Sequence, residues 1–302
     1  MKILNFGSVN IDFTYRVPHF VRPGETLAAT SVTRNAGGKG FNQSVALARA
    51  GCDVYHAGHI GEDGFFLVDL CRNYGVHTDF LTKVSTPTGN AIIQVDGSGA
   101  NCILLYGGAN RVMNMDFVTE VLSHFEKGDM IVLQNEINCM NEILYLAHEV
   151  GLTIAINPAP MNDAISKEVL ALADWIILNE TEAEGLTGET QTDVQLEALR
   201  KSFPDSAFVL TLGVHGSICM KDGRICRSGA CKVEAVDTTA AGDTFVGFFL
   251  AEITSGKTPE EALLTATRAS ALAVTKRGAA QSVPTLEQVR KCGLMPEPFD
   301  AK

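Results

Sequence analysis

Strand-like and helix-like segments alternate along most of this chain. The apolar run at 130–134 (MIVLQ) is typical of a buried strand, and residues 141–150 follow it with apolar residues at helical spacing before Gly151 closes the segment. The other predicted strands are 152–157, 175–179 and 208–212, and the other predicted helices are 41–50, 65–74, 240–255 and 260–276. Strands that are regularly separated by helices predict an α/β fold, in which helices cover both faces of a largely parallel sheet.

Two segments interrupt this alternation. Residues 13–36 contain prolines and glycines and then alternating residues, while residues 91–106 hold two strand-like runs, AIIQV and CILLY, joined by the hairpin signal DGSG. Both insertions are too short to fold alone. We therefore expect a single domain over residues 1–302, with a small β lid built from about 13–36 and 90–108. A third β-rich stretch lies at 216–236.

The charge of the chain narrows the classes of partner. Its 302 residues include 24 Lys and Arg against 35 Asp and Glu, a formal net charge of -11. A nucleic-acid-binding protein usually presents a basic face, so we expect no nucleic acid partner. Polar residues interrupt every apolar run before it reaches the length of a membrane span, which predicts no membrane partner.

The cysteines and the first residues indicate where the protein resides. The chain has eight cysteines, none of them in a C-x-x-C pair or at zinc-finger spacing. Reduced thiols are typical of cytosolic proteins. Residues 3–7 are strand-like and directly follow Met1-Lys2, so no signal-peptide core precedes them. These features predict a cytoplasmic protein.

Two motifs near the beginning of the chain have polar groups that could bind a polyol. Asn10 and Asp12 alternate after the first strand, so their side chains share one face of an extended backbone. An amide and a carboxylate on one face can accept and donate hydrogen bonds to hydroxyl groups, although an Asx turn would use the same residues. The cluster Gly37-Gly38-Lys39-Gly40 opens a helix and allows close approach of a ligand, or simply forms a flexible turn. It matches neither a P-loop nor G-x-G-x-x-G.

The sharpest motif is DTTAAGDTF at residues 237–245. Small residues lead into a strong helix, so the backbone amides of Ala241, Gly242 and Asp243 can converge on a negative charge. A carboxylate inside such an anion site is costly unless chemistry uses it. Asp243 can accept the proton of a hydroxyl group that attacks a phosphoryl group held by these amides. The alternative is that Asp243 only caps the helix.

Two further motifs follow predicted strands. Glu182 belongs to an acidic first helical turn after Asn179, which is either a partner of the helix dipole or a holder of hydrated Mg²⁺ beside phosphates. Thr211, Gly213 and Gly216 close another strand and could let a nucleotide come near. The seven histidines have no paired spacing, which favours surface or core roles for them.

Taken together, these motifs resemble the ribokinase branch of the PfkB carbohydrate kinases, and the resemblance covers nearly the whole chain. The segments that carry it are GSVNID at 7–12, PGET at 23–26, GGKGFN at 37–42, NPAP at 157–160, NETEAE at 179–184, residues 237–243, and AVTKRG at 273–278 with SVP at 282–284. Each motif is weak alone, but their order is specific. The resemblance implies a three-layer α/β/α sandwich with a β lid.

The resemblance also implies a role for particular residues. Asp243 would be the general base. The residues implied to bind the sugar are Asn10, Asp12, Gly38, Lys39, Asn42 and Glu136. Those implied to contact ATP are Asn179, Thr211, Gly213, Gly216, Ala240, Ala241 and Gly242. Glu182 would hold Mg²⁺ through water. The positions implied to surround a monovalent cation such as K⁺ are Asp237, Thr239, Ala273, Lys276, Gly278 and Ser282.

The function that the resemblance implies is an ATP-dependent sugar kinase that converts D-ribose to D-ribose 5-phosphate, acting as a homodimer that pairs through the β lid. Its expected partners are the small-molecule sugar and ATP. A fructokinase or a nucleoside kinase is the alternative on the same fold, and Phe13, Tyr15 and Tyr106 could build an aromatic slot for a base. A non-catalytic sugar-binding regulator is disfavoured because Asp243 and the glycine cluster are present. An NAD-dependent dehydrogenase is disfavoured because the dinucleotide fingerprint is missing.

Overall fold

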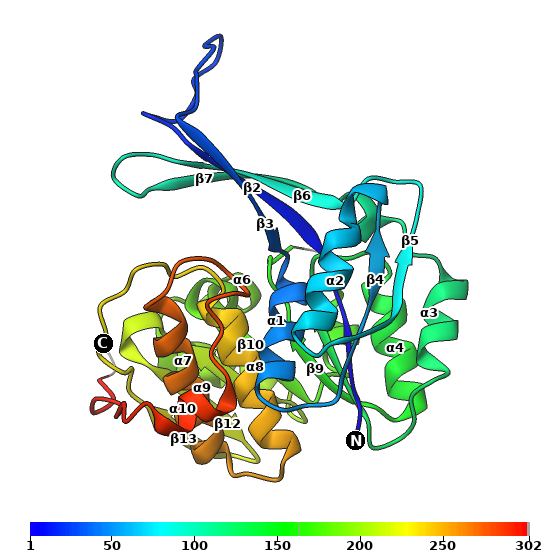
Figure 1. Ribbon diagram of the computed structural model, residues 1–302. Coiled ribbons are helices and arrows are strands. Elements are labelled where there is room, and N and C mark those ends of the chain that lie inside the picture. The colour runs from blue at the N-terminus through cyan, green and yellow to red at the C-terminus, as the bar shows by residue number, and fades with distance from the viewer. Residues whose placement is uncertain (163, 301–302) are drawn as a thin grey trace.

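A nine-stranded sheet forms the centre of the protein in the computed structural model, which describes residues 1–162 and 164–300 (Figure 1). The strand order is β13-β12-β11-β10-β9-β8-β1-β4-β5. Neighbouring strands are parallel except for β12, which is antiparallel to both β11 and β13. The strands are β1 (Ile3–Phe6), β4 (Val54–Ile60), β5 (His77–Lys83), β8 (Met130–Gln134), β9 (Thr153–Asn157), β10 (Trp175–Asn179), β11 (Ala207–Thr211), β12 (Ser217–Lys221) and β13 (Arg224–Ser228).

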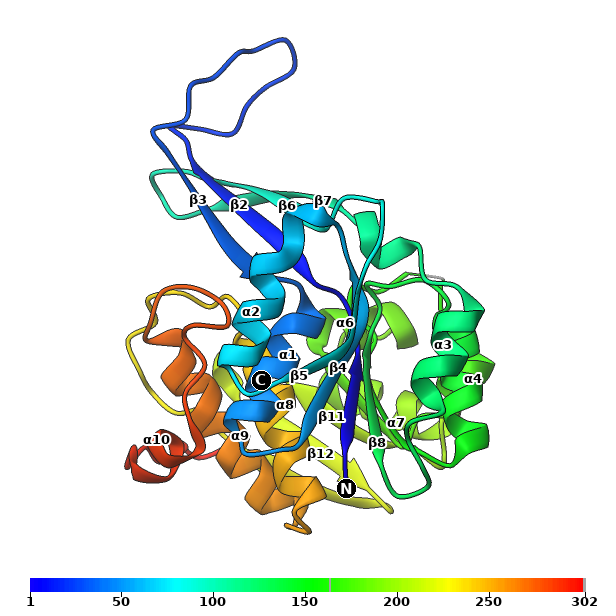
Figure 2. The same ribbon diagram turned by 45° about the vertical axis from the view of Figure 1, so that its right-hand side comes forward.

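Helices cover both faces of this sheet and give the molecule three layers (Figures 1 and 2). Successive residues of a strand face opposite sides, so Ile3 packs into one hydrophobic cluster and Leu4 into the other. The first cluster includes α1 (Lys39–Arg49), α2 (Phe65–Asn73), α8 (Ala241–Thr254), α9 (Pro259–Val274) and α10 (Leu286–Lys291). The second includes α3 (Met115–Leu122), α4 (Met140–Val150), α5 (Lys167–Leu170), α6 (Glu180–Thr187) and α7 (Thr192–Ser202). The predicted α/β/α arrangement is confirmed.

Local signals set the ends of the helices. At the start of α9, the Thr258 side chain accepts from the Glu261 amide and the Glu261 carboxylate accepts from the Thr258 amide, which is a capping box. At the end of α4, Gly151 adopts the left-handed conformation that closes a helix, with φ 82°. Over the described ranges, 1–162 and 164–300, no helix combines the length and the apolar character needed to cross a membrane.

A second sheet of four strands forms the lid, which continues from the carboxyl end of β1 and projects from the body of the molecule (Figure 2). Its order is β3-β2-β6-β7, with β2 antiparallel to β3 and parallel to β6. The strands are β2 (Asn10–Arg16), β3 (Ser31–Gly37), β6 (Gly89–Val95) and β7 (Asn101–Tyr106). The sheet starts three residues before the predicted segment, because Asn10 already pairs with Gly37 and Gly89.

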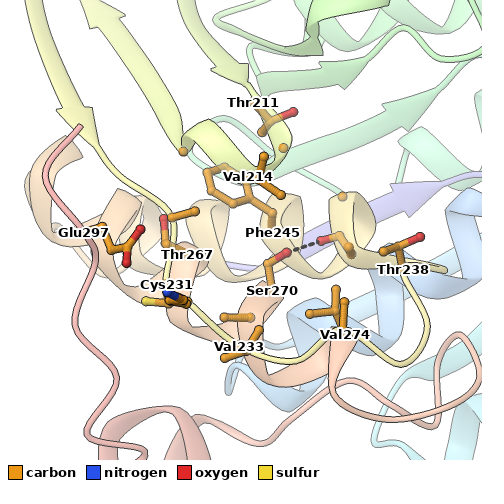
Figure 3. Close-up of a pocket in the computed structure, with 18 residues that line it drawn as sticks. Thr211, Val214, Cys231, Val233, Thr238, Phe245, Thr267, Ser270, Val274 and Glu297 are labelled. Atoms are coloured by element: carbon orange, nitrogen blue, oxygen red, sulfur yellow. Dashed lines mark hydrogen bonds between the residues drawn. The ribbon is translucent and has the colours of Figure 1, made fainter. Parts of the chain in front are cut away.

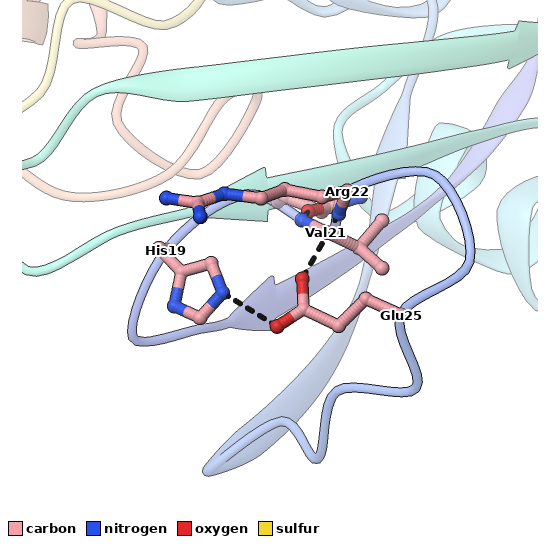
Figure 4. Close-up of polar contacts among 5 residues, drawn as sticks. His19, Val21, Arg22 and Glu25 are labelled. Atoms are coloured by element: carbon pink, nitrogen blue, oxygen red, sulfur yellow. Dashed lines mark hydrogen bonds and ion pairs between the residues drawn. The ribbon is translucent and has the colours of Figure 1, made fainter.

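The long turn between β2 and β3 is closed by Glu25 (Figure 4). One carboxylate oxygen of Glu25 lies 2.8 Å from His19 Nε2, and the other accepts from the Arg22 amide at 3.0 Å. The Val21 amide donates to Gln94 of β6 at 3.0 Å, which ties the turn to the neighbouring strand. The hydrogen bond from the Arg22 amide, followed by the contact with His19, lowers the pKa of Glu25. Glu25 of the PGET motif therefore has a structural role in this turn.

The third β-rich stretch joins the edge of the central sheet. β12 and β13 form a hairpin whose two turn residues, Asp222 and Gly223, have φ of 50° and 74°. Such a pair of positive φ values suits the tight turn that two antiparallel strands require. The hairpin ends near Gly216 and Ser228, which places the chain beside α8 and α9, where the site described below lies.

The beginning of α1 lies directly against the end of β1. A Cβ on Gly40 would lie 2.4 Å from the Ser8 amide nitrogen and 2.6 Å from the Gly7 carbonyl carbon. The Phe41 amide donates to the Ser8 carbonyl at 2.8 Å, so the backbone of the first turn is held by the residues that follow β1. Only glycine allows two backbones to approach so closely. This contact brings the glycine cluster of residues 37–40 to the first residues of β2.

Candidate active site

Asp12 of β2 lies beside Gly37, the first glycine of the cluster, on the neighbouring strand β3 of the lid sheet. Asp12 pairs with Asn35 in the β2–β3 ladder, and a Cβ on Gly37 would lie 1.9 Å from Asp12 Oδ2. Glycine at position 37 therefore leaves the space that the carboxylate occupies. Burial, and to a lesser extent the charge of Glu136, raises the pKa of Asp12 to about 6. A perturbed carboxyl group of this kind is typical of a functional site.

Glu136 follows β8 and joins the two parts of this site. Its Oε2 accepts hydrogen bonds from the Ser8 hydroxyl and from the Lys39 amide, the latter at 3.0 Å. These contacts hold the first residue of α1 beside the turn between β1 and β2. The structure thus brings Glu136 to Asp12 and Lys39, from a position about a hundred residues away in the sequence.

Asn110, which sequence reasoning missed, orients Asn10. Its Nδ2 donates to Asn10 Oδ1 at 2.8 Å, and its Oδ1 accepts from the Val9 amide at 3.0 Å. Asn110 lies in the 3-10 helix η2 (Gly108–Arg111), just after the lid strands. A Cβ on Gly89 would lie 2.2 Å from the Asn110 amide nitrogen, so the fit is close. No pattern in the sequence links residues 10 and 110, because the contact is purely tertiary.

Asp243 lies in the first turn of α8 and is 7% exposed. Its Oδ2 accepts from Asn42 Nδ2 and its Oδ1 from Gln43 Nε2, both at 3.0 Å. The N-cap of α8 is Ala240 and not Asp243, so the alternative that Asp243 only caps this helix is wrong. Ala240 has a left-handed backbone with φ 57°, and its methyl group cannot cap the helix. The Ala241 amide donates to the Thr238 carbonyl at 3.2 Å, and with no side-chain acceptor at the N-cap the amides of Gly242 and Asp243 can receive an anion.

Lys39 lies among carboxylates from three different parts of the fold. Burial disfavours its charged form, but the charges of Asp243, Glu136 and Glu182 outweigh this effect, and the pKa of Lys39 is raised. Lys39 is therefore a cation at neutral pH. Its positive charge balances that of the carboxylates of Asp243 in α8, Glu182 in α6 and Glu136 after β8.

A cavity of about 460 Å³ opens beside α8 and α9 (Figure 3). Five residues predicted to contact ATP line it: Thr211, Gly213, Gly216, Ala241 and Gly242. Asn179 and Ala240 are not among the lining residues. Other lining residues that the sequence did not indicate are Val233, Ala235, Thr238, Phe245, Ser270 and Val274. The volume is in the range of small-molecule sites, and the walls are mostly apolar.

The polar groups of this cavity are few. The Ser270 hydroxyl donates to the Ala241 carbonyl at 3.0 Å, as Figure 3 shows, and this bond joins α9 to the first turn of α8. Thr267 Oγ1 is buried without a hydrogen-bond partner in the part of the chain that the structure describes. Gly216 has φ 105°, and a Cβ there would lie 2.0 Å from the Ser228 carbonyl oxygen. Gly216 is thus required by the closure of the β12–β13 hairpin as well as lining the cavity.

Glu182 and Asn179 form a capping box at the start of α6. The Glu182 carboxylate accepts from the Asn179 amide at 2.9 Å, and Asn179 Oδ1 accepts from the Glu182 amide at 2.8 Å. Asn157 Nδ2 also donates to Glu182, at 3.2 Å. The cap explains the presence of Asn179 and Glu182 at this spacing. The cap also directs the carboxylate toward the space shared with Lys39.

Asp237 joins two loops, one that precedes α8 and one that follows α9. Its Oδ1 accepts from Thr239 through both the amide and the hydroxyl, and its Oδ2 accepts from the Gly278 amide at 2.9 Å. The predicted cation residues Ala273, Lys276 and Ser282 belong to the second loop and to the end of α9, and the Lys276 side chain is exposed. Among the described residues, no three His, Cys, Asp or Glu side chains gather as a metal cluster. A cation in these loops would depend on carbonyl oxygens.

The fold and the site suit a phosphotransferase: a buried carboxylate, Asp243, lies in the first turn of α8 beside an apolar cavity. The model described as "pfkB family carbohydrate kinase" matches residues 1–286, so the chain belongs to the PfkB family of carbohydrate kinases. The predicted class of enzyme, an ATP-dependent sugar kinase, is thereby confirmed.

Individual proteins are similar over almost the whole chain. A ribokinase of Haemophilus influenzae is 38% identical over 293 residues, which cover 93% of this chain and 95% of that protein. A deoxyribokinase of Salmonella typhi is 32% identical over 300 residues, covering 95% and 97%. Among solved structures, Arabidopsis thaliana ribokinase complexed with ribose and ATP is 30% identical, with a TM-score of 0.86 and coverage of 96% and 97%.

Proposed function

We propose that this protein transfers the γ-phosphoryl group of ATP to D-ribose and forms D-ribose 5-phosphate. The observation that carries the proposal is the position of Asp243. Its carboxylate is buried, and its two oxygens accept hydrogen bonds from the side-chain amides of Asn42 and Gln43 in α1. It lies between the sugar-side loop at Gly38 and the cavity lined by Gly242. Similarity to a ribokinase solved with ribose and ATP supports the choice of both substrates.

Asp243 would accept the proton of the ribose 5-hydroxyl group while the hydroxyl oxygen attacks the γ-phosphorus of ATP. The bond from phosphorus to the β–γ bridging oxygen breaks, and ADP leaves. Little covalent chemistry is required of the protein, so positioning and charge stabilisation provide most of the rate enhancement. The amides at Ala240, Ala241, Gly242 and Asp243 would hold the transferring group, since the amides at a helix N-terminus favour anions.

The cations expected in this reaction would be held by few protein groups. Glu182 suits hydrated Mg²⁺, because Mg²⁺ retains its waters and needs one or two carboxylates, and bound Mg²⁺ would neutralise charge on the phosphates.

A K⁺ site would be surrounded by residues of the two loops beside α8 and α9: Asp237, Thr239, Ala273, Lys276, Gly278 and Ser282. The carboxylate of Asp237 and nearby backbone carbonyls are hard oxygen ligands, which suit such a cation.

The sugar would lie among Asn10, Asp12, Gly38, Lys39, Asn42 and Glu136. Phe13 supports a sugar over a nucleoside: it lies on the opposite face of β2 from Asp12, and it packs against the hydrophobic cluster of α1 and α2. An aromatic slot built on Phe13 would therefore not face the carboxylate that binds the hydroxyl groups. Tyr15 shares the face of Phe13 for the same reason.

We also propose that two copies of the protein pair through their lids. Strand β7 is exposed along its whole length, and its apolar residues Ile103, Leu104, Leu105 and Tyr106 are between 47 and 68% exposed. An apolar edge strand of this kind favours association. Analytical ultracentrifugation should show a dimer, and Leu104→Glu should shift it toward monomer. A monomeric unaltered protein at micromolar concentration would overturn this proposal.

A cytoplasmic location is the third part of the proposal. All eight cysteines are free thiols. Burial raises the pKa of the Cys71 thiol to about 12 and that of Cys52 to about 11, so both remain protonated. Reduced thiols accord with a reducing compartment. Microscopy of a tagged protein in its own host tests the location.

The substrate assignment is tested by measuring ADP release with ribose, 2-deoxyribose, fructose, adenosine and pseudouridine under the same conditions. We expect kcat/KM to be highest with ribose. Preference for 2-deoxyribose would indicate that the 2-hydroxyl is not recognised, and preference for a nucleoside or fructose would overturn the assignment. Binding of sugar without any ADP release would indicate a regulator rather than a kinase.

A further inference from the structure

We propose that Gln43 is a positioning residue for phosphoryl transfer, which holds the Asp243 carboxylate in the orientation that accepts the substrate proton. This inference rests on the proposed role of Asp243 as general base. Gln43 would not touch substrate. Instead, it would act through Asp243, and a continuous chain of buried polar side chains would orient Gln43 itself.

The first step in the argument is the contact between α1 and α8. A Cβ on Gly247 of α8 would lie 2.4 Å from the Ala46 methyl group of α1, so the glycine lets the two helices pack closely. At this separation two consecutive residues of α1 reach one carboxylate, Asn42 at Oδ2 and Gln43 at Oδ1. A carboxylate oxygen can accept two hydrogen bonds, so each oxygen retains capacity for a hydroxyl group.

The second step concerns the orientation of the Gln43 amide. Gln43 Oε1 accepts from Gln134 Nε2 at 2.7 Å. If the Gln43 amide flipped, its Nε2 would meet the Gln134 donor and its Oε1 would meet the Asp243 carboxylate. Both new contacts would be repulsive. Gln134 therefore fixes which end of the Gln43 amide faces the base.

Gln134 is oriented in turn by Asn5. Gln134 Nε2 also donates to Asn5 Oδ1 at 2.9 Å, and Asn5 Nδ2 donates to the Gly40 carbonyl and to Ser44 Oγ, both at 2.7 Å. A backbone carbonyl accepts hydrogen bonds and cannot donate them. The Gly40 carbonyl thus fixes the orientation of Asn5, and Asn5 fixes that of Gln134.

His56, at the other end of this series of hydrogen bonds, is consistent with the same assignment of donors and acceptors. Its Nε2 lies 3.2 Å from the Gly7 carbonyl and its Nδ1 lies 2.7 Å from Ser44 Oγ. Burial lowers the pKa of His56 to about 4, so the ring is neutral at physiological pH. The carbonyl requires the proton on Nε2, so Nδ1 accepts from the Ser44 hydroxyl, which leaves Ser44 Oγ free to accept from Asn5. Every hydrogen bond in the chain then has one donor and one acceptor.

Two further observations favour a positioning role over a purely structural one. Asn5, Gln43, Ser44, His56 and Gln134 are all 0% exposed, so water cannot replace a missing member. Gln134 Oε1 is buried without a partner among the described residues, which costs stability. Asn42 Oδ1, on the other donor to Asp243, is unpaired among the described residues as well, whereas the Gln43 amide has a partner at both ends.

The test is a double-mutant cycle with Gln43→Met, which retains the shape of the side chain and removes the amide. We expect kcat for sugar phosphorylation to fall about 10- to 100-fold, with the KM values for sugar and ATP changed less than threefold, because ground-state contacts remain. In the Asp243→Asn background the same change should lower kcat less than twofold, since the base through which Gln43 acts is already lost.

Gln195→Met is the matched control, because Gln195 is a buried glutamine on α7 that bonds only to backbone carbonyls. It should lower thermal stability as much as Gln43→Met and leave kcat within twofold. If Gln43→Met does not fold, Gln43→Asn replaces it, since the shorter amide falls short of Asp243. An equal loss of kcat in both backgrounds, or no loss, would overturn the inference. An unaltered protein that phosphorylates no sugar, or Asp243→Asn with near-normal kcat, would instead overturn the proposed function.

Discussion

Asn42 donates a hydrogen bond to Asp243 across 201 positions of sequence, at a distance of 3.0 Å. The contact joins the glycine-led first turn of α1 to the first turn of α8, and so connects the motif proposed to bind the sugar with the motif proposed to bind phosphate. Neither motif alone forms the site around Asp243, because each supplies only part of it. Small residues at the start of each helix leave room for the ligands that we propose to bind there.

Asp243→Asn should lower kcat by roughly two to four orders of magnitude, the usual contribution of a general base. The new amide must place an N–H against the donor of Asn42 or of Gln43, so stability should also fall, by about 1–3 kcal/mol. A coupled ADP-release assay and urea denaturation measure the two effects. Turnover within tenfold of the unaltered protein, with folding intact, would contradict the role of Asp243.

Sugar binding should weaken in acid. Because burial raises the pKa of Asp12 to about 6, this carboxylate takes up a proton as the pH falls below that value and loses capacity to accept from hydroxyl groups. The KM for sugar should rise about fivefold between pH 6 and pH 5, as expected for one required ionised group of pKa about 6. Asp12→Asn is the control, and its KM should be high and nearly independent of pH in this range. A constant KM in the unaltered protein would refute the prediction.

Asp12→Asn should also stabilise the folded protein at pH 7. The folded state raises the pKa of Asp12 from 3.8 to about 6. The stability that the protonated Asp12 carboxyl contributes is therefore fully present below pH 3.8 and is lost as the pH rises through 6. The charged form therefore costs up to about 3 kcal/mol at pH 7, which a neutral amide avoids. Urea denaturation should show the gain at pH 7 and a smaller one at pH 4. A variant less stable at pH 7 would contradict it.

Gly40→Ala should destabilise the fold by at least about 1–3 kcal/mol, because the new methyl group meets backbone that cannot move aside. Gly97→Ala is the matched control: it lies in the lid hairpin, and a Cβ there has no atom within 4 Å. The control should change stability by less than about 0.5 kcal/mol. Thermal unfolding compares the two variants. Equal effects would show that the close contact of α1 with β1 is not important for the stability of the fold.

Ala271→Phe should impair ATP binding selectively. Ala271 lines the cavity beside α8 and is buried, so a phenyl ring there would occupy space that the nucleotide needs. We expect the KM for ATP to rise at least about tenfold, which corresponds to 1.4 kcal/mol of lost binding. The Kd for sugar, measured by calorimetry without nucleotide, should be unchanged. A parallel loss of sugar binding would show that the substitution disturbs the whole site.

Much of the fold follows from local pattern. The strands at 130–134 and 175–179 have the predicted bounds, because each is a short apolar run buried on both faces. Helix ends are less well predicted: α1 begins at Lys39 and not at 41, because the Ser8 and Gly38 carbonyls accept from its first amides. The former contact is tertiary, and the helical period of the sequence does not contain it.

The amino-acid sequence by itself determined the alternation of strands and helices, the lid segments and the residue types that phosphoryl transfer needs, because hydrophobic period and glycine placement are local properties. Only the tertiary structure decided that Asn110 orients Asn10, that residues near 233 and 274 wall the cavity, and that Gln43 reaches Asp243. The two hydrogen bonds join segments that are 100 and 200 residues apart, and the cavity walls come from separate elements that meet only in the folded chain. Their geometry depends on how the sheet and its two helical layers pack, which no local pattern encodes.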